Sequence, residues 1–403
     1  MTSPRLPVGE RIRYYRLKNG NRKQSAIAGL CGITERYLSQ IENGKAVPSL
    51  DVLAAIAAEL GVPLAALLSE TAADPGSSAA LTISPDVAHA LMGYGPPVSA
   101  GPATAVSLRE RVEDAWRIWQ TSETRFTEAQ TALPQLIADT EHAVRAHRRA
   151  SDSTDLREVH RAAADLYGLL RSYCRRTGRL DLALMAADRA TRAAEDADDP
   201  VRIAAAQWNL GHVLLSQEDG ADEAADVAER AVEQLKKAPA TSEVTALKGA
   251  LELVSVVADA RRHRWWDARA RLEKHVLPLS KQAGEGNTMW TVFGPTNVHL
   301  HALSIEMLAG ESAEGLRVAD HVDISQLPSR ERQWTFTLEV ARCYDLRRDD
   351  AAVLVHLLAL EELSSEDMAR SRTAAELVGG LLRRVRPTYR PQVTGLAERL
   401  GYL

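Results

Sequence analysis

The chain has 403 residues, which is enough for two or three folded domains that each bury a core of their own. Its three cysteines, Cys31, Cys174 and Cys343, are far apart and form no C-x-x-C pair, which argues against a disulfide framework and a structural zinc site. Aromatic residues make up 5% of the chain and the hydrophobic set 45%, so Ala, Leu and Val must build most of the core, and we expect an all-α protein.

The net charge of −5 is unevenly distributed along the chain. Residues 1–70 carry nine basic and six acidic side chains, a net charge of +3, which leaves −8 for the remainder. A basic head on an acidic body is expected when only the head meets a polyanion. There is no apolar run of about 18 residues and no signal-like segment in residues 1–10, so we expect a cytoplasmic protein with no membrane partner.

Residues 1–70 predict one compact domain of five short helices. Apolar side chains recur at helical spacing, and cap residues mark where the helices begin and end. The expected helices are Val8–Lys18, Lys23–Leu30, Thr34–Asn43, a helix that Ser49 caps and Gly61 ends, and Pro63–Leu67.

The second and third of these helices predict a helix-turn-helix. Gly32 allows the sharp turn between them, and Ala28 lets the two helices approach closely. Ile33, Leu38 and Ile41 then face the core, which leaves the polar side chains of the third helix outward, in a form that fits a major groove.

The tract YLSQIENGKAVPS makes this segment similar to the lambda-repressor-like, xenobiotic-response-element family over about residues 8–68. The resemblance implies a role for each matching position on double-stranded DNA. Gln24 contacts phosphate and the recognition helix, and Lys23, which replaces the usual Ser or Thr cap, touches phosphate. The base-edge positions are Glu35, Arg36 and Gln40, and the backbone positions are Thr34, Asn43 and Lys45.

The chemistry of these side chains is compatible with base contacts. Arg36 pairs bidentately with guanine and Gln40 with adenine, while Glu35 either accepts from cytosine or orients Arg36 or Arg11. One such module makes too few phosphate contacts for tight specific binding. We therefore expect a homodimer on a pseudo-palindromic operator, with half-sites about 34–36 Å apart.

Residues 71–104 are rich in Gly, Pro, Ser and Ala and are expected to be a linker, with at most one short helix near Pro85–Met92. From residue 105 to 403 helical patterns follow one another, and a turn-plus-Ala motif recurs at spacings of 41 and 44 residues. This repetition predicts an α-solenoid of stacked helix pairs. The motif favours degenerate tetratricopeptide-like pairs, although the spacing also overlaps that of HEAT repeats.

We expect the solenoid to be a ligand-sensing and dimerisation domain rather than an enzyme, with no cofactor and no metal. It contains no H-E-x-x-H motif and no Gly-rich phosphate loop. A solenoid binds ligands on its concave face, which the first helix of each pair lines. The candidate ligand residues in these first helices are Arg171, Trp208, Asn209, His212, Trp290, Phe293, Asn297, Trp334 and Arg342. Such side chains suit a peptide or an acidic small molecule, or else pack one repeat on the next.

A head of this family joined to tetratricopeptide-like repeats resembles the RRNPP peptide-sensing regulators, and equally the actinobacterial regulators of the same layout. The tract FGPTNVHLH is similar to one found in the actinobacterial group. The resemblance implies a dimeric transcriptional regulator whose solenoid binds an effector that changes operator binding. The alternative is an adaptor in which the head localises the chain on DNA and the solenoid docks a protein partner.

Overall fold

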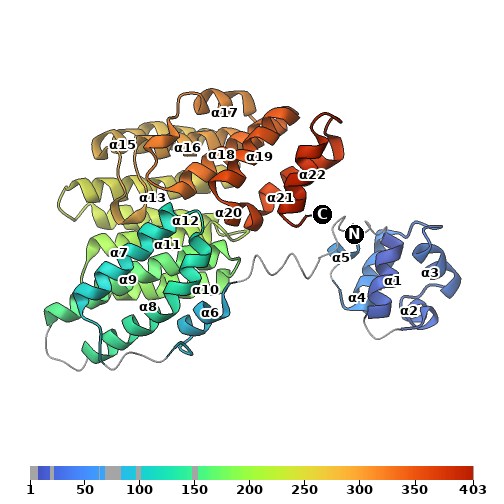
Figure 1. Ribbon diagram of the computed structural model, residues 1–403, viewed down its shortest axis with the longest axis horizontal. Coiled ribbons are helices and arrows are strands. Elements are labelled where there is room, and N and C mark those ends of the chain that lie inside the picture. Colours follow the sequence, from blue (N-terminus) through green and yellow to red (C-terminus); the bar gives the residue numbers. More distant parts are fainter. Residues whose placement is uncertain are drawn as a thin grey trace. The chain divides into compact units, whose positions relative to one another are not determined.

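The computed structural model describes residues 8–18, 22–62, 64–68, 83–96, 101–147 and 153–402. Every regular element in these ranges is helical, which confirms the all-α prediction (Figure 1). The chain divides into two compact units at residues 79 and 80, which we call the head and the body.

The head is the predicted five-helix domain. Ser49 Oγ accepts from the Val52 N–H at 3.4 Å, so the predicted cap forms, and Thr34 Oγ1 caps the preceding helix by accepting from the Tyr37 N–H at 3.2 Å. Gly61 ends the fourth helix with a φ of 67°, whereas Pro63 lies outside the described residues. The helices are α1 (Val8–Lys18), α2 (Gln24–Leu30), α3 (Glu35–Glu42), α4 (Leu50–Leu60) and α5 (Leu64–Leu68).

Helix α1 lies directly on the end of α3. A Cβ added at Gly9 would be 1.9 Å from the carbonyl oxygen of Ile41 and 3.0 Å from Cα of Glu42. Both atoms belong to the backbone, so no side-chain rotation relieves the overlap. Gly9 therefore sets how closely the two helices approach, and through them the position of α3.

We expect Gly9→Ala to lower the free energy of unfolding of the head by about 1–3 kcal/mol, although alanine is the better helix former. The matched control is Gly29→Ala in α2, where an added Cβ meets nothing within 4 Å, and where we expect a gain of roughly 0.5–1 kcal/mol. Hydrogen exchange of the α1–α3 amides in the full chain measures both. Equal protection in the two variants would contradict the close approach at Gly9.

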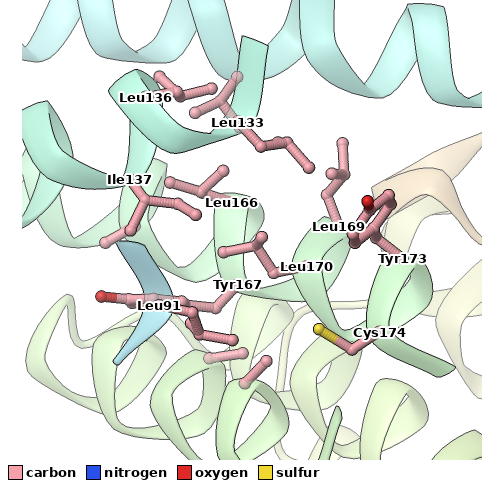
Figure 2. Close-up of a cluster of buried hydrophobic side chains, with 14 of the residues drawn as sticks. Leu91, Leu133, Leu136, Ile137, Leu166, Tyr167, Leu169, Leu170, Tyr173 and Cys174 are labelled. Carbon is pink, nitrogen blue, oxygen red and sulfur yellow. The ribbon is translucent and has the colours of Figure 1, made fainter. Parts of the chain in front are cut away.

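The short helix expected inside the linker is α6 (Pro85–Leu91), and it belongs to the body. Its residues Val87 and Leu91 are fully buried in the same core as Leu133 and Ile137. Figure 2 shows Leu91 among the side chains of α8 (Arg125–His147) and α9 (Ser153–Arg176). The segment that joins the two units is therefore shorter than the expected 71–104, because the apolar face of α6 is covered by α8.

The body is an array of helices that pack against one another in chain order, which confirms the predicted α-solenoid (Figure 1). Each recurring turn-plus-Ala motif begins the second helix of a pair, and alanines of the first three motifs, such as Ala183, Ala224 and Ala268, are buried. The pairs are α9 with α10 (Leu180–Asp196), α11 (Pro200–Leu214) with α12 (Ala221–Leu235), α13 (Ser242–Arg261) with α14 (Trp265–Arg271), α16 (Pro295–Leu308) with α17 (Ser312–Ala319), and α18 (Arg330–Leu346) with α19 (Asp350–Leu363).

Other helices complete the array. Helix α14 continues through a π-helical turn at Leu272–Val276 into α15 (Leu277–Ala283). Three helices precede the pairs and three follow them: α6, α7 (Ala105–Thr121), α8, α20 (Ser365–Arg370), α21 (Arg372–Arg384) and α22 (Arg390–Arg399). No helix in the described ranges is long and apolar enough to span a bilayer.

One first helix is shorter than the sequence predicts. The tract MWTVFGP was expected to be helical, but α16 begins only at Pro295, because a proline favours the first position of a helix. Trp290 and Phe293 thus lie in the preceding segment, where Met289, Trp290 and Val292 have φ values of 47°, 61° and 54°. Three non-glycine residues in the left-handed region mark this segment as strained.

Candidate functional site

Helix α3 presents a polar face to solvent. Thr34, Glu35 and Arg36 are exposed and Gln40 is partly exposed, while Leu38 and Ile41 are buried in the core of the head. The Thr34 cap fixes the first turn, so the base-reading side chains project from a regular helix end. This arrangement suits insertion into a major groove.

A buried ion pair holds α3 against α1 and α2. Glu42 is 3% exposed, and Arg16 donates to its two carboxylate oxygens at 2.7 and 2.9 Å. Gln24 Nε2 donates to the same carboxylate at 2.7 Å, so Gln24 links the first helix of the motif to the recognition helix. The hydrogen bonding of the Arg16 guanidinium to Glu42 raises the pKa of Arg16.

Sequence reasoning missed Arg16 and Glu42. The available signal was position, because Arg16 follows Ile12 by one helical turn on the inward face of α1, and Glu42 follows the buried Ile41. Two charges of opposite sign on apolar faces of neighbouring helices indicate a buried pair.

A concavity of about 500 Å³ opens between α1, α2 and α3. The exposed cations Arg13 and Lys23 lie at it, and Lys23 begins α2 without a side-chain cap, as its replacement of Ser or Thr predicts. The lining residues are Arg13, Arg16, Lys23, Gln24, Ser25, Glu35, Glu42 and Asn43. The cations beside α3 suit contact with a phosphate backbone.

The remaining head residues lie near the end of α3. Asn43 Nδ2 donates to the carbonyl oxygen of Ser39 at 2.7 Å, and Lys45 is exposed just beyond. Arg11, one suggested partner of Glu35, is buried and donates to the carbonyl oxygen of Leu67 at 3.0 Å. Glu35 itself is exposed beside Arg36.

In the body, the structure brings together four of the predicted ligand residues. The Arg171 guanidinium donates to Asn209 Oδ1 and lies 5.4 Å from the centre of the Trp208 ring. The Trp208 and His212 rings pack edge to face, with their centroids 4.6 Å apart. Arg171 is 3% exposed, and Asn209 and Trp208 are also buried.

The other predicted ligand residues have packing roles or separate partners. Trp290 stacks on Trp116 at 5.4 Å, and Phe293 is buried against Gly249, where a Cβ would overlap its ring. Trp334 is buried and donates from Nε1 to the carbonyl oxygen of Leu360 at 3.2 Å. Arg342 pairs with Glu339 at 3.1 Å.

Four more residues extend the polar group around Arg171. Arg175 lies one turn along α9, Arg332 lies on α18, and Asn297 and His301 lie one turn apart on α16. We call Arg171, Arg175, His212, Asn297, His301 and Arg332 the inner cluster. Sequence reasoning missed Arg175, His301 and Arg332, although Arg175 shares a helix face with Arg171.

The charges of the inner cluster affect one another. Burial, and then the neighbouring Arg175, lower the pKa of Arg171. Burial and Arg332 lower the pKa of His301 to about 4, and burial and Arg171 lower that of His212. Both imidazoles are therefore neutral at pH 7, while the guanidiniums keep their charge.

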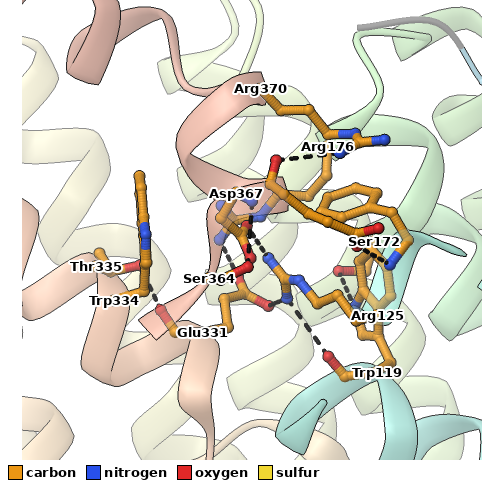
Figure 3. A network of polar contacts seen from close by, with 12 residues as sticks. Trp119, Arg125, Ser172, Arg176, Glu331, Trp334, Thr335, Ser364, Asp367 and Arg370 are labelled. Carbon is orange, nitrogen blue, oxygen red and sulfur yellow. Dashed lines mark hydrogen bonds and ion pairs between the residues drawn. The ribbon is translucent and has the colours of Figure 1, made fainter. Parts of the chain in front are cut away.

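A second buried network joins the first helices of the body to the last ones (Figure 3). Arg125, at the start of α8, is 2% exposed; its guanidinium pairs with Glu331 of α18 at 3.0 Å and with Asp367 of α20. Arg176 of α9 also pairs with Glu331. The ends of the helical array are thus held together by buried charges.

No group of three or more His, Cys, Asp or Glu side chains in the described ranges is placed to hold a metal ion.

Comparisons with known proteins identify the head. Residues 12–67 match the helix-turn-helix family HTH_3, so the head is a helix-turn-helix DNA-binding domain. No curated protein sequence matches the chain.

Similar solved structures cover most of the chain. PlcR of Bacillus thuringiensis, in complex with the peptide PapR7 and DNA, is 13% identical over 88% of this chain and 99% of its own, with a TM-score of 0.27. The apo competence regulator ComR from Streptococcus vestibularis is 11% identical over 99% of both chains, with a TM-score of 0.30. Apo ComR from S. thermophilus is 11% identical over 91% of this chain and 98% of its own, with a TM-score of 0.29. At these identities and TM-scores, functional arguments depend on this chain's own residues.

Proposed function

We propose that this protein, a regulator with a helix-turn-helix DNA-binding head, binds a pseudo-palindromic operator as a homodimer, and that an effector held by the body changes its operator affinity. The observation that carries the proposal is the exposed face of α3, with Arg36 and Gln40 free of the core and the cations Arg13 and Lys23 beside it. This combination provides base readout and phosphate contact on one surface.

The size of the head supports a dimer. One module of about 60 residues offers a single recognition helix and a few cations, whereas specific regulators neutralise several phosphates to reach nanomolar affinity. A two-fold dimer doubles these contacts without any new residue. Two chains per duplex and half-sites about 34–36 Å apart are the expected stoichiometry and spacing.

The effector acts through linkage. A ligand that binds the body more tightly in one arrangement of the two heads shifts the equilibrium toward that arrangement. A tenfold change in operator affinity requires about 1.4 kcal/mol of difference between the ligand's affinities for the two arrangements. The buried polar group around Arg171, Asn209 and His212 supports a ligand site, because it contains more polar groups than packing requires.

We expect Arg36→Ala and Gln40→Ala each to reduce selectivity for the operator by about 1–3 kcal/mol, because each removes a bidentate contact to a base. The operator is first selected from a random duplex library, and affinities for it and for a scrambled duplex are then measured by fluorescence anisotropy as a function of salt.

Lys45→Ala is the matched control. It removes a phosphate contact, so affinity should fall for both duplexes alike and the salt dependence should decrease by about one phosphate. The proposal fails if the protein selects no duplex sequence, or if Arg36→Ala and Gln40→Ala behave as Lys45→Ala does.

A further inference from the structure

We propose that the body binds a small, multiply charged anion between Arg171 and Arg175 of α9 and Arg332 of α18. The ligand class is a compact molecule with a phosphate ester or several carboxylates, together with one hydrogen-bond donor. This inference rests on the proposed function, because it names the chemical class of the effector.

Arg332 is distant in the sequence from Arg171 and Arg175 and meets them in the folded body. Arg171 and Arg175 are one turn apart on α9, and Arg332 lies on α18, whose neighbour Glu331 pairs with Arg176 of α9. The electrostatic influence of Arg332 reaches Arg171, Arg175, His212 and His301. The inner cluster is therefore one group drawn from α9, α11, α16 and α18.

The charges around this group do not balance. Five guanidiniums, those of Arg125, Arg171, Arg175, Arg176 and Arg332, interact electrostatically with Glu331, and Asp367 pairs with Arg125. Arg125 and Arg176 pair with these two carboxylates, whereas no ion pair is found for the other three arginines within the described ranges. Guanidiniums stay protonated at neutral pH, so the three unpaired ones require a counter-anion.

Three buried polar atoms without a hydrogen-bond partner lie in the inner cluster. Arg171 Nε and Arg175 Nε are buried without a hydrogen-bond acceptor, and so is Asn297 Oδ1 without a donor. Arg171 is 3% exposed and Asn297 2% exposed, so bulk water does not satisfy either. An anionic ligand supplies acceptors to the two arginines, and a hydroxyl or amide of the same ligand supplies the donor for Asn297.

The surroundings favour a compact anion over a peptide backbone. Trp208 lies beside the Arg171 guanidinium and limits its motion, while neutral His212 offers one N–H donor without adding charge. Fork-shaped guanidinium donors match the paired oxygens of phosphate or carboxylate. Three guanidiniums offer more hydrogen-bond donors than the single carboxylate of a peptide terminus can accept.

The test uses the full chain with inorganic pyrophosphate and citrate as separate probes in calorimetric titrations. At least one probe should bind, and its dissociation constant should rise roughly 10-fold to 150-fold in Arg175→Gln and in Arg332→Gln. Preference for pyrophosphate indicates a phosphorylated ligand, and preference for citrate a polycarboxylate. Arg372→Gln, at a side chain that is 92% exposed on α21, is the control and should leave binding unchanged.

A second measurement needs no probe. In probe-free buffer, Arg175→Gln and Arg332→Gln should raise the midpoint of thermal unfolding of the body, because each removes one of several mutually repelling charges. Arg176→Gln, the neighbour that is already paired with Glu331, should lower that midpoint. A purely structural role for Arg175 or Arg332 would lower it in those variants too.

The inference is overturned if neither probe binds, if both variants bind as tightly as the wild type, or if both variants lower the unfolding midpoint. Its failure is distinct from that of the proposed function. Binding of a probe that leaves operator affinity unchanged would sustain the anion site and contradict effector control. Selective DNA binding without any probe binding would contradict the anion site and leave the proposed operator binding intact.

Discussion

Replacing Arg125 by methionine should destabilise the body by about 3–5 kcal/mol, since it leaves Glu331 and Asp367 partly uncompensated in the interior. Burial alone disfavours the Arg125 charge, but Glu331 and Asp367 outweigh burial and raise its pKa. The guanidinium also lies 4.5 Å from the centre of the Trp119 ring. Methionine has a comparable length, so the loss reports the charge more than the volume.

Chemical denaturation of the full chain, followed by tryptophan fluorescence, measures this effect. Arg109→Met is the matched control, because Arg109 lies on the neighbouring α7 with a half-exposed side chain that is 4.0 Å from Glu113. We expect a change of less than about 0.5 kcal/mol there. Adding Asp367→Leu to Arg125→Met should recover part of the loss, because an apolar replacement of both partners leaves less buried charge. Equal stability of the Arg125 and Arg109 variants would contradict the network.

The position of Arg125 links the stability of the body to the proposed anion site. Its partners lie on α18 and α20, so the pair holds the first helices of the body against the last ones (Figure 3). Arg332, one of the three proposed anion ligands, follows Glu331 directly on α18. Loosening the network should therefore also weaken probe binding to the inner cluster. The stability of the body and its affinity for the anion therefore both depend on the same buried charges.

Local signals in the sequence were enough to predict the head. Thr34 and Ser49 mark helix starts, Gly32 allows the turn and Gly61 ends α4, and all of these act within one or two turns of the chain. The repeats of the body were predictable for a similar reason, since each recurring turn-plus-Ala motif marks the start of a second helix. Contacts between residues close in the sequence can be recognised from the pattern of a single sequence.

The contacts that define the candidate sites are of long range and leave no such pattern. Arg16 meets Glu42 across 26 residues, and Arg125 meets Asp367 across 242 residues. The burial of Arg16 and Glu42 could be inferred from their positions beside apolar residues, but the separation of 242 residues between Arg125 and Asp367 carries no signal. Trp290 illustrates the converse, because its aromatic character suggested a ligand contact, yet it stacks on Trp116 from a strained segment that precedes α16. The deciding factor in each case is which helices the fold brings together.

The buried pair of the head leads to the second large effect. Arg16→Met removes the two hydrogen bonds that the guanidinium donates to the carboxylate of Glu42, which is 3% exposed. The carboxylate then keeps the hydrogen bond from Gln24. We expect a loss of about 3–5 kcal/mol. A domain of this size has little stability in reserve, so the variant head should be largely unfolded at 25 °C.

This loss should differ in kind from that of the base-reading variants. Arg16→Met should abolish binding to operator and scrambled duplexes alike and remove the hydrogen-exchange protection of α1–α3, while the body keeps its unfolding transition. Arg13→Met is the matched control on the exposed side of α1, and it should weaken phosphate contact without unfolding the head. The double variant Arg16→Met with Glu42→Leu should regain exchange protection, since no charge is then left buried. Full protection in Arg16→Met alone would mean that Gln24 is sufficient to hold Glu42, and that the arginine is not needed to position the recognition helix.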